Sequence, residues 1–531
     1  MRAVPSVFQK FMLLFPQNRK QNKDAFMKEE SAMCEELDKI INAKLDAREE
    51  RGRNEGENDS KRRTARNLTK MGMSIEQIAE AVEEDISVVK EWIAESVETP
   101  DENTWVFTIR DGVTFSNGKT VDAEAVKACF ERTYGMNERA DSTLKIASME
   151  ADGMQFTIVT PEPDPTLLND LCDPLLGIYD ASEEPDEELG VSCTGPYIAT
   201  SFTAMADVSM RANKSYWGGA PAVDTIELKI IDDQDALDMA LANGEIDLIA
   251  QETANGAAKF TDTSLYTTDM VTTTRANYLN FNLRSEGLDD KQVREAINFC
   301  IDRESFAEVV YQGFATPCYG IYPENLTFGG TDGLKLTVDS YDPEKAGELL
   351  AEAGYEDTDG DGILDKDGKN LSFKVITYSY NNNCIQLADM LQAELAQIGI
   401  DISIETMDVL DDALASGDYD IAILNYAMAP IGIPSYFINM VFTTGASNNY
   451  GGYTNEKVDA LAAEISSTAD TAKVDALTKE LSQQVLDDNA FAFVADQQLI
   501  FVYANKVKGV QINPTEYYLV TNTLTVEEQS K

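Results

Sequence analysis

The sequence predicts an α/β protein, and three observations after residue 100 support this fold class. From Thr104 onward, short apolar strands alternate with glycine turns and amphipathic helices. A strand–helix–strand unit spans residues 371–404, and Tyr419 to Asn425 has the apolar run of another buried strand. The chain has 531 residues, of which 43% are hydrophobic, which suffices for more than one packed domain.

The first of these elements is a strand from Trp105 to Ile109, in which apolar and polar residues alternate. A hairpin turn follows at Ser116-Asn117-Gly118, and Asp122 provides the cap of a helix. The residues expected on the buried face of this helix are Ala125, Val126, Cys129 and Phe130.

The strand–helix–strand unit begins with a strand from Leu371 to Tyr378. An amphipathic helix from Ile385 to Ile398 is stopped by Gly399, and the next strand alternates at Ile400, Ile402 and Ile404. Two strands joined through a helix are expected to be parallel.

Residues 1–100 form a charge-rich segment of a different character. Ser74-Ile75-Glu76-Gln77 is a capping box, and a second short helix is expected from Ser87 to Ile93. The pair resembles a helix-turn-helix, but the acidic turn Glu83-Glu84-Asp85 would repel phosphates, so a plain helical hairpin is favoured over DNA binding. The segment also resembles the C-terminal tail of transposase-like recombination-promoting nucleases.

Composition excludes several classes of function. The net charge of −50 disfavours binding to nucleic acid or anionic lipid through the molecule as a whole. Without histidine there is no Ser-His-Asp relay and no zinc site that uses histidine. The seven cysteines show no metal-ligand spacing, and no apolar stretch is long enough to span a membrane.

Two loops after predicted strands are candidates for ligand binding. Ligands of open α/β sheets bind beyond the carboxyl ends of the strands. One loop runs from Tyr378 to Asn383, and the other runs from Asn425 to Tyr436. The candidate binding residues in these loops are Tyr378, Tyr380, Asn425, Tyr426 and Tyr436. Tyr and Asn offer neutral donors, acceptors and flat faces, which suit holding a polar molecule without chemistry, so no catalytic residue is expected.

Residues 101–531 resemble the family 5 solute-binding proteins of ABC transporters, which capture peptides, nickel chelates and metallophores. The stretches that carry the resemblance are Phe107 to Val126, Thr194-Gly195-Pro196-Tyr197, Asn213 to Gly219, Asn243 to Asp247, Val293 to Ile297 with Ile301-Asp302-Arg303, and Tyr341 to Ala346. The resemblance implies a two-lobed, type II periplasmic-binding-protein-like fold, preceded here by an extra helical segment. It also implies an ABC permease as partner and an extracytoplasmic location.

The resemblance divides the chain into residues 101–270 in a first lobe, 271–500 in a second lobe, and 501–531 returning to the first. Closure of the lobes around a ligand would be a population shift. Tyr278 and Asn280 are then expected to line the cleft. Neither an export signal nor the family's first core strand is recognisable before Thr104, so a fusion or truncation is expected.

The expected ligand is a small polar solute, either a nickel chelate or metallophore or a peptide-like molecule. Family peptide binders carry an Asp where this chain has Ile433, which argues against free peptides. The segment Gly445 to Gly451 resembles the nickel or metallophore branch and nominates Asn448 and Asn449. Because the chain has no histidine, a metal would arrive already chelated.

An acidic loop provides a possible calcium site, the one cofactor that the sequence suggests. Asp357, Asp359, Asp361 and Asp365 occupy positions 1, 3, 5 and 9 of a calcium-loop pattern, with Gly362 at the turn. Position 12 is Gly368 instead of a bidentate Glu, and an ordinary acidic hairpin remains the alternative.

Two other functions remain open at this point. One is an intracellular fusion whose N-terminal helices act in a DNA or recombination context, with a non-functional binding-protein passenger. It would form a salt-sensitive DNA complex through residues 48–97. The other is a carboxylate-pair glycosidase, but no particular acid is nominated for that chemistry.

Overall fold

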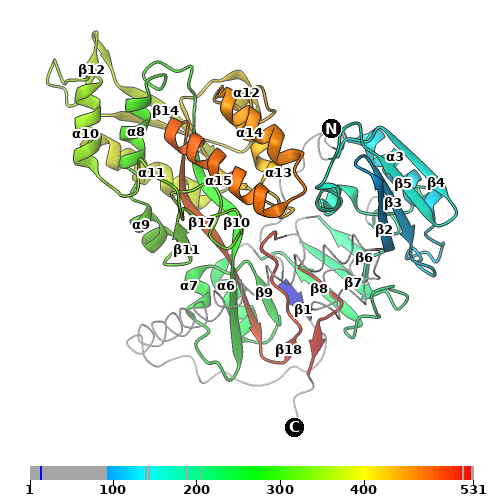
Figure 1. Cartoon of the computed structure of the whole chain (residues 1–531). Helices are drawn as coiled ribbons and strands as arrows, with labels where there is room; N and C mark the ends of the chain where they lie inside the picture. Colours follow the sequence, from blue (N-terminus) through cyan, green and yellow to red (C-terminus); the bar gives the residue numbers. More distant parts are fainter. Residues whose placement is uncertain are drawn as a thin grey trace.

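The structure is a computed structural model of the whole chain. It describes residues 12–14, 93–137, 140, 144–186, 189–204, 206–231, 233–516 and 519–527. The chain forms two lobes that share one sheet of 11 strands (Figure 1). We call residues 276–495 lobe II and the other described residues lobe I.

Lobe II is built on a mixed sheet. Its strands are β10 (Tyr266–Phe281), β11 (Ala315–Pro317), β14 (Ser372–Tyr378), β15 (Asp401–Met407), β16 (Ile421–Ala427) and β17 (Phe491–Ala504), with a separate hairpin β12 (Asp365–Lys366) and β13 (Lys369–Asn370). Strand β14 pairs in parallel with both β15 and β16, while β10 pairs antiparallel with β16 and β17. The predicted parallel strand–helix–strand unit is thereby confirmed.

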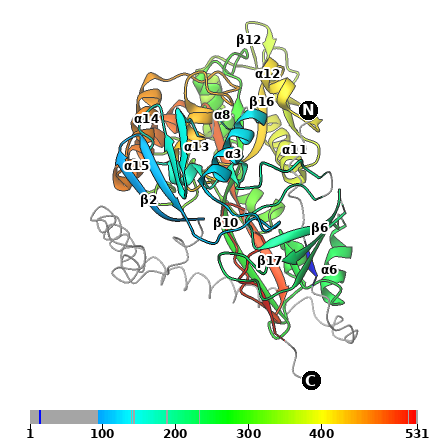
Figure 2. The ribbon, with the colours of Figure 1, turned by 90° about the vertical axis from the view of Figure 1, so that its right-hand side faces the viewer.

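Helices cover both faces of this sheet. They are α8 (Lys291–Phe299), α9 (Arg303–Ser305), η3 (Phe306–Val310), α10 (Pro343–Glu352), α11 (Asn382–Gln397), α12 (Asp411–Ser416), α13 (Ser435–Phe437), η4 (Ile438–Phe442), α14 (Glu456–Ser466) and α15 (Thr471–Asp488). One core packs the sheet against α8, α10 and α11, and a second core packs the other face against α13, α14 and α15. Figure 2 shows α13, α14 and α15 together on one side of the lobe.

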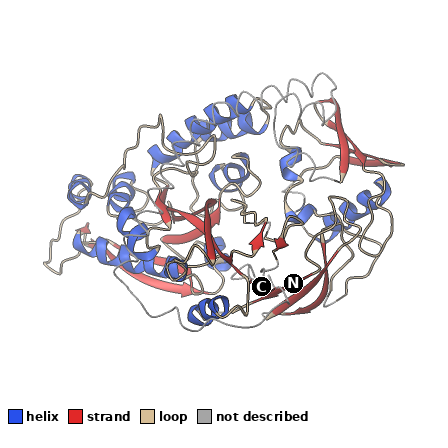
Figure 3. Cartoon of the chain, turned by 90° about the horizontal axis from the view of Figure 1, so that it is seen from below, coloured by secondary structure: helices blue, strands red, loops and turns tan. Residues whose placement is uncertain are grey.

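Lobe I contains the rest of the large sheet and a smaller sheet. The strands of the large sheet are β1 (Met12–Leu14), β6 (Tyr197–Thr203), β7 (Asp207–Ala212), β8 (Thr225–Lys229) and β9 (Leu248–Ala250), with β18 (Val507–Lys508) and β19 (Thr525–Val526) beside it. The four-stranded sheet has β2 (Ala94–Asp101), β3 (Thr104–Ile109), β4 (Ser148–Asp152) and β5 (Gln155–Val159). Seen from below, this small sheet and the helix-rich part of lobe II lie at opposite sides of the molecule (Figure 3).

The helices of lobe I are α3 (Ala123–Met136), α5 (Leu167–Asp170), η2 (Pro174–Leu176), α6 (Gln234–Ala242) and α7 (Ala254–Ala257). The side chain of Asp122 accepts the backbone N–H of Ala125 and so caps α3, as predicted. This helix packs on the small sheet through Val126 and Phe130.

Strands β10 and β17 run from one lobe into the other and form the connection between them (Figures 1 and 2). They pair in two stretches, and the register shifts between Thr272 and Ala276. The Thr273 hydroxyl donates to the Gln497 carbonyl at 2.8 Å, and the Thr274 N–H donates to the Pro514 carbonyl at 3.1 Å. A bulge of this kind bends a strand pair locally, and we call residues 273–275, where the pair passes between the lobes, the hinge.

Two strands precede Thr104, in the region where the sequence shows no recognisable first core strand. Strand β1 lies between β8 and β9 and pairs antiparallel with both, and β2 pairs with β3. A three-residue strand is too short for alternation of polarity to reveal it, and its partners lie more than 200 residues further along the chain. The helical hairpin predicted at 74–93 falls largely outside the described residues; within them, Ile93 is at a bend directly before β2.

Candidate functional site

Tyrosine side chains gather at the edge of the lobe II sheet where β14 and β16 end. Tyr378 is the last residue of β14, and Tyr426 is near the end of β16. The two strands are parallel, so their carboxyl ends meet at one edge of the sheet. Both rings pack against the second core of lobe II and stay partly exposed.

The tyrosine edge continues into the flanking loops. Tyr380 lies 5.2 Å from Tyr378 between ring centroids and is 46% exposed. Tyr450, half-buried, packs on the same core. Burial raises the pKa of the Tyr378 hydroxyl, and the neighbouring tyrosines raise it further. The edge is therefore an uncharged aromatic surface with hydrogen-bonding hydroxyls.

Tyr278 and Asn280, predicted to line the cleft, lie in the interior of lobe II. Tyr278 is 3% exposed and stacks on Phe493 at 5.9 Å, and Phe437 meets its ring edge-on at the same distance. Asn280 is fully buried, and its side-chain oxygen accepts the Tyr419 hydroxyl. Both side chains alternate onto the face of β10 that packs the core, which the tyrosine-rich sequence alone does not reveal.

Asn425 projects from β16 next to the hinge. Its side-chain oxygen accepts a hydrogen bond from Nη1 of Arg275 at 3.3 Å, and its side-chain nitrogen donates one to Oε1 of Gln497 at 3.4 Å. Arg275 also forms an ion pair with Glu516, at 2.9 Å between Nε and Oε2. Arg275 was not among the predicted residues, although it lies only three residues before Tyr278, which was predicted to line the cleft.

The loop after β16 touches lobe I. The side-chain amide of Asn169, in α5, donates to the carbonyl oxygen of Ile431 at 3.0 Å. Gly432 has a φ of +73°, a conformation that favours glycine, and it lets the chain turn beside Asn169. The loop is anchored to lobe II because the Tyr322 hydroxyl donates to the Pro434 carbonyl at 2.8 Å. The half-buried Tyr436 follows in α13.

Asn449 holds its own loop together. Its amide nitrogen donates to the carbonyls of Thr443 and Tyr453, and its side-chain oxygen accepts the N–H of Tyr453. All three distances lie between 2.7 and 2.9 Å. Asn448 is half-buried, and its backbone N–H donates to the Met440 carbonyl. The structure therefore gives Asn449 a loop-positioning role.

Asp496 is a buried carboxyl on β17 beside the hinge. It is 5% exposed, and its Oδ1 has no hydrogen-bond partner among the described residues. Burial raises the pKa of Asp496 to about 7, and the hydrogen bond with Cys318 acts in the opposite direction. Asp496 is therefore largely protonated at mildly acidic pH.

The acidic loop brings three of its four predicted ligands together. Asp357, Asp359 and Asp361 are exposed, and each offers a carboxylate oxygen within 4.8 Å of the others. Asp365 lies apart from them: it is buried, and its Oδ2 accepts the N–H and hydroxyl of Thr358. The fourth ligand is thus committed to the hairpin, and calcium binding stays a prediction.

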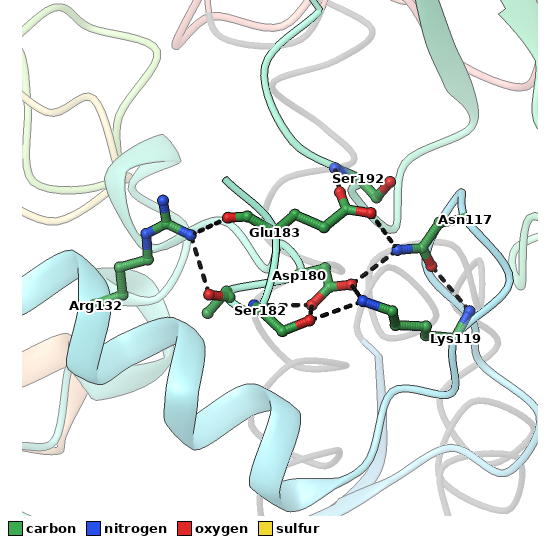
Figure 4. Close-up of polar contacts among 8 residues, drawn as sticks. Asn117, Lys119, Arg132, Asp180, Ser182, Glu183 and Ser192 are labelled. Carbon is green, nitrogen blue, oxygen red and sulfur yellow. Dashed lines mark hydrogen bonds and ion pairs between the residues drawn. The ribbon is translucent and has the colours of Figure 1, made fainter. Parts of the chain in front are cut away.

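A second polar cluster, in lobe I, has a structural role (Figure 4). Asp180 is 5% exposed, and its carboxylate accepts hydrogen bonds from Nζ of Lys119 at 2.7 Å, from Nδ2 of Asn117 at 2.8 Å and from the hydroxyl of Ser182. Burial alone would raise the pKa of Asp180, but these hydrogen bonds together lower it below its usual range. The cluster fastens the segment around Asp180 to the turn that contains Asn117.

Comparison with known proteins identifies relatives of the whole described fold. The family model for "Bacterial extracellular solute-binding proteins, family 5 Middle" matches residues 88–449. The nickel-binding protein NikA of Staphylococcus aureus is 26% identical over 444 residues, covering 83% of this chain and 87% of NikA. The oligopeptide-binding protein AppA of Bacillus subtilis is 25% identical over 448 residues, covering 80% of this chain and 81% of AppA.

Solved structures agree in fold. NikA of Staphylococcus aureus, in complex with Ni(L-His)2, matches with a TM-score of 0.70 and 25% identity over 82% of this chain and 91% of that one. A nickel ABC transporter structure from Bacillus halodurans matches with a TM-score of 0.66 and 28% identity over 82% of this chain and 90% of that one. Among the described residues, no helix is long and apolar enough to cross a membrane.

Proposed function

This chain belongs to family 5 of the bacterial extracellular solute-binding proteins, and from that premise we propose that it captures a chelated metal, of the nickel chelate or metallophore class, for an ABC importer. The ligand would bind between the lobes against the tyrosine edge, and the closed form would be presented to the permease outside the cytoplasm. A peptide-like solute is the second candidate, because AppA is a relative of similar identity.

The observation that carries the proposal is the position of the tyrosine edge. Tyr426 and the loop that follows it lie on the side of lobe II that touches lobe I through Asn169 and Ile431. A ligand held there would contact both lobes. Because it makes contacts with both only when the lobes are close together, its binding favours the closed form.

The chemistry of the edge supports a chelate over a bare ion. Imidazole nitrogen is a preferred protein ligand of a bare nickel ion, but the chain contains no histidine. The cysteines of lobe II, Cys300, Cys318 and Cys384, form no disulfide and are buried. Neutral tyrosine hydroxyls suit the outer surface of a complex whose coordination sites are already filled.

The rival assignment as a DNA-related fusion gains no support. The family match begins at Val88, inside the segment that was expected to be foreign to the fold. Of residues 48–97, which were expected to bind DNA, only 93–97 lie within the described part of the chain, and they form a bend and the start of β2.

Isothermal titration tests the proposal with nickel–histidine complex, nickel–metallophore complex and short peptides. We expect saturable binding of one metal complex, and we expect Tyr426→Ala to weaken it by roughly tenfold, since burial of one aromatic face contributes about 1–2 kcal/mol. The matched control is Tyr503→Ala, a half-buried tyrosine of lobe I in β17. Binding of peptides alone would reassign the substrate, and equal affinity of Tyr426→Ala and wild type would reject the site.

A further inference from the structure

Lobe II contains a small polar cavity that the proposed transport function does not use. It leaves a volume of about 10 Å³ for the centre of a water-sized particle, which is room for one small ligand. Its lining residues are Asn298, Arg303, Tyr319, Leu336, Thr337, Val338, Leu486, Asn489, Phe491 and Phe493. Thr337 is exposed, so the cavity can be reached from solvent.

A chain of hydrogen bonds fixes which side-chain atoms of the lining residues are donors and which are acceptors. The Arg303 guanidinium can only donate, so its contact through Nη2 identifies Oδ1 of Asn298 as the acceptor. The amide nitrogen of Asn298 must then donate, and it meets Oδ1 of Asn489 at 2.9 Å. This leaves Nδ2 of Asn489 as a donor, and it has no partner among the described residues although Asn489 is only 1% exposed.

Arg303 contributes a buried positive charge beside that donor. Arg303 is 2% exposed, and its hydrogen bonds go to the carbonyls of Cys318, Phe493, Asn298 and Ile301 and to the Asn298 side chain. No described carboxylate forms an ion pair with it. The centroid of the Tyr319 ring lies 4.6 Å from the guanidinium carbon of Arg303, and Glu394 and Glu304 act on Arg303 only at a distance. Burial raises the pKa of Glu394 to about 7, so these groups compensate the charge of Arg303 only in part.

These features favour an anion over a water molecule. A buried charge without a partner is costly, and a ligand of opposite charge removes that cost. The two groups whose direction is fixed, Nη2 of Arg303 and Nδ2 of Asn489, are both donors, whereas a water molecule also needs acceptors for its own hydrogens. The cavity is too small to hold a sulfate or phosphate ion.

We propose that this cavity binds a small monovalent anion, of the size of chloride, held by Asn489 and Arg303. The anion would join three elements: the end of α15, whose cap is Asn489, the start of β17, and the residue Arg303 that opens α9. Because β17 continues into the hinge, the anion supports the lobe II end of the connection between lobes.

Bromide crystallography of the wild-type full-length chain tests the site directly. We expect an anomalous peak within about 3.5 Å of Nδ2 of Asn489 and of Arg303. In solution, we expect the melting temperature to rise saturably, by about 2 °C, when sodium gluconate is replaced by sodium chloride at constant ionic strength.

Asn489→Asp is the decisive variant. Its carboxylate would supply the negative charge that the anion supplies in wild type, and it would still accept the hydrogen bond from the amide nitrogen of Asn298. We expect it to abolish both the peak and the chloride effect. Asn243→Asp, the same change at the exposed end of α6, should retain the chloride effect. Absence of a bromide peak in wild type, or an unchanged chloride effect in Asn489→Asp, overturns the proposal. If Asn489→Asp does not fold, the wild-type bromide map decides alone.

Discussion

Single side chains show how the same residue types serve two purposes in lobe II. Tyr378 and Tyr426 keep part of their rings exposed at the sheet edge. Tyr278 lies on β10, the strand next to β16, and its ring is packed between Phe437 and Phe493. The difference follows from the alternation of side chains along a strand and from the helices that cover each face. Residue type therefore nominates candidates, and strand position selects among them.

Asn449 illustrates a predicted site residue whose measurable role is structural. Asn449→Ala removes three short hydrogen bonds, and we expect the free energy of unfolding to fall by about 1–3 kcal/mol. Chemical denaturation of the two variants Asn449→Ala and Asn448→Ala measures this, since the Asn448 contact uses only its backbone. Equal stability of both variants would contradict the loop-positioning role.

Asp496 makes stability depend on pH in a defined direction. Its pKa is raised to about 7 in the folded chain, while the unfolded chain has the ordinary value near 3.9. Between about pH 4 and pH 7 the folded state therefore binds more protons than the unfolded state, so the stability contributed by Asp496 is lost as the pH rises. Below about pH 4 both states are protonated, and the contribution is complete.

Asp496→Asn removes this titration. We expect the free energy of unfolding of the variant, relative to wild type, to rise by on the order of 3 kcal/mol between pH 4 and pH 8. The charged and titratable groups that act on this position are Glu324 and Cys318. Urea unfolding at several pH values provides the measurement, and parallel pH profiles for variant and wild type would show that Asp496 does not titrate in this range.

At the scale of elements, the contact between α5 and the loop after β16 is the feature most relevant to closure. Asn169→Ala removes one hydrogen bond between the lobes, so we expect roughly fivefold weaker ligand binding if that contact helps to hold the closed form. Asn103→Ala is the matched control, because its amide makes the same 3.0 Å bond to the Thr160 carbonyl within lobe I. Titration calorimetry should show weaker ligand binding for Asn169→Ala and unchanged binding for Asn103→Ala. Equal affinities of the two variants would show that the contact between Asn169 and Ile431 does not contribute to closure.

The elements that the sequence predicts well are those with strong local signals. The strand β3, the cap of α3 and the parallel pair β14 and β15 follow from alternation, capping residues and glycine stops. Asn381 was expected in a ligand loop, but its side chain accepts the Cys384 N–H and caps α11. Capping and ligand binding call for the same polar residues after a strand, so the sequence alone does not separate them.

At the scale of the whole molecule, contacts between segments that are distant in sequence determine which features can be predicted from the sequence. The two-lobed fold followed from the family resemblance and is confirmed by structural relatives. Strand β1 was missed because its partners are distant in sequence, and the burial of Asn280 depends on helices that arrive more than 100 residues later. The hinge bulge likewise exists only where β10 and β17 meet.

The central claim is that the two lobes close around a solute. Small-angle X-ray scattering of the full chain, with and without the metal complex that binds in calorimetry, measures this directly. We predict a radius of gyration that falls by about 1 Å on saturation, as expected for hinge closure of a two-lobed protein, and a smaller fall for Asn169→Ala at equal saturation. Scattering curves that superimpose at saturating ligand would contradict closure as the basis of function.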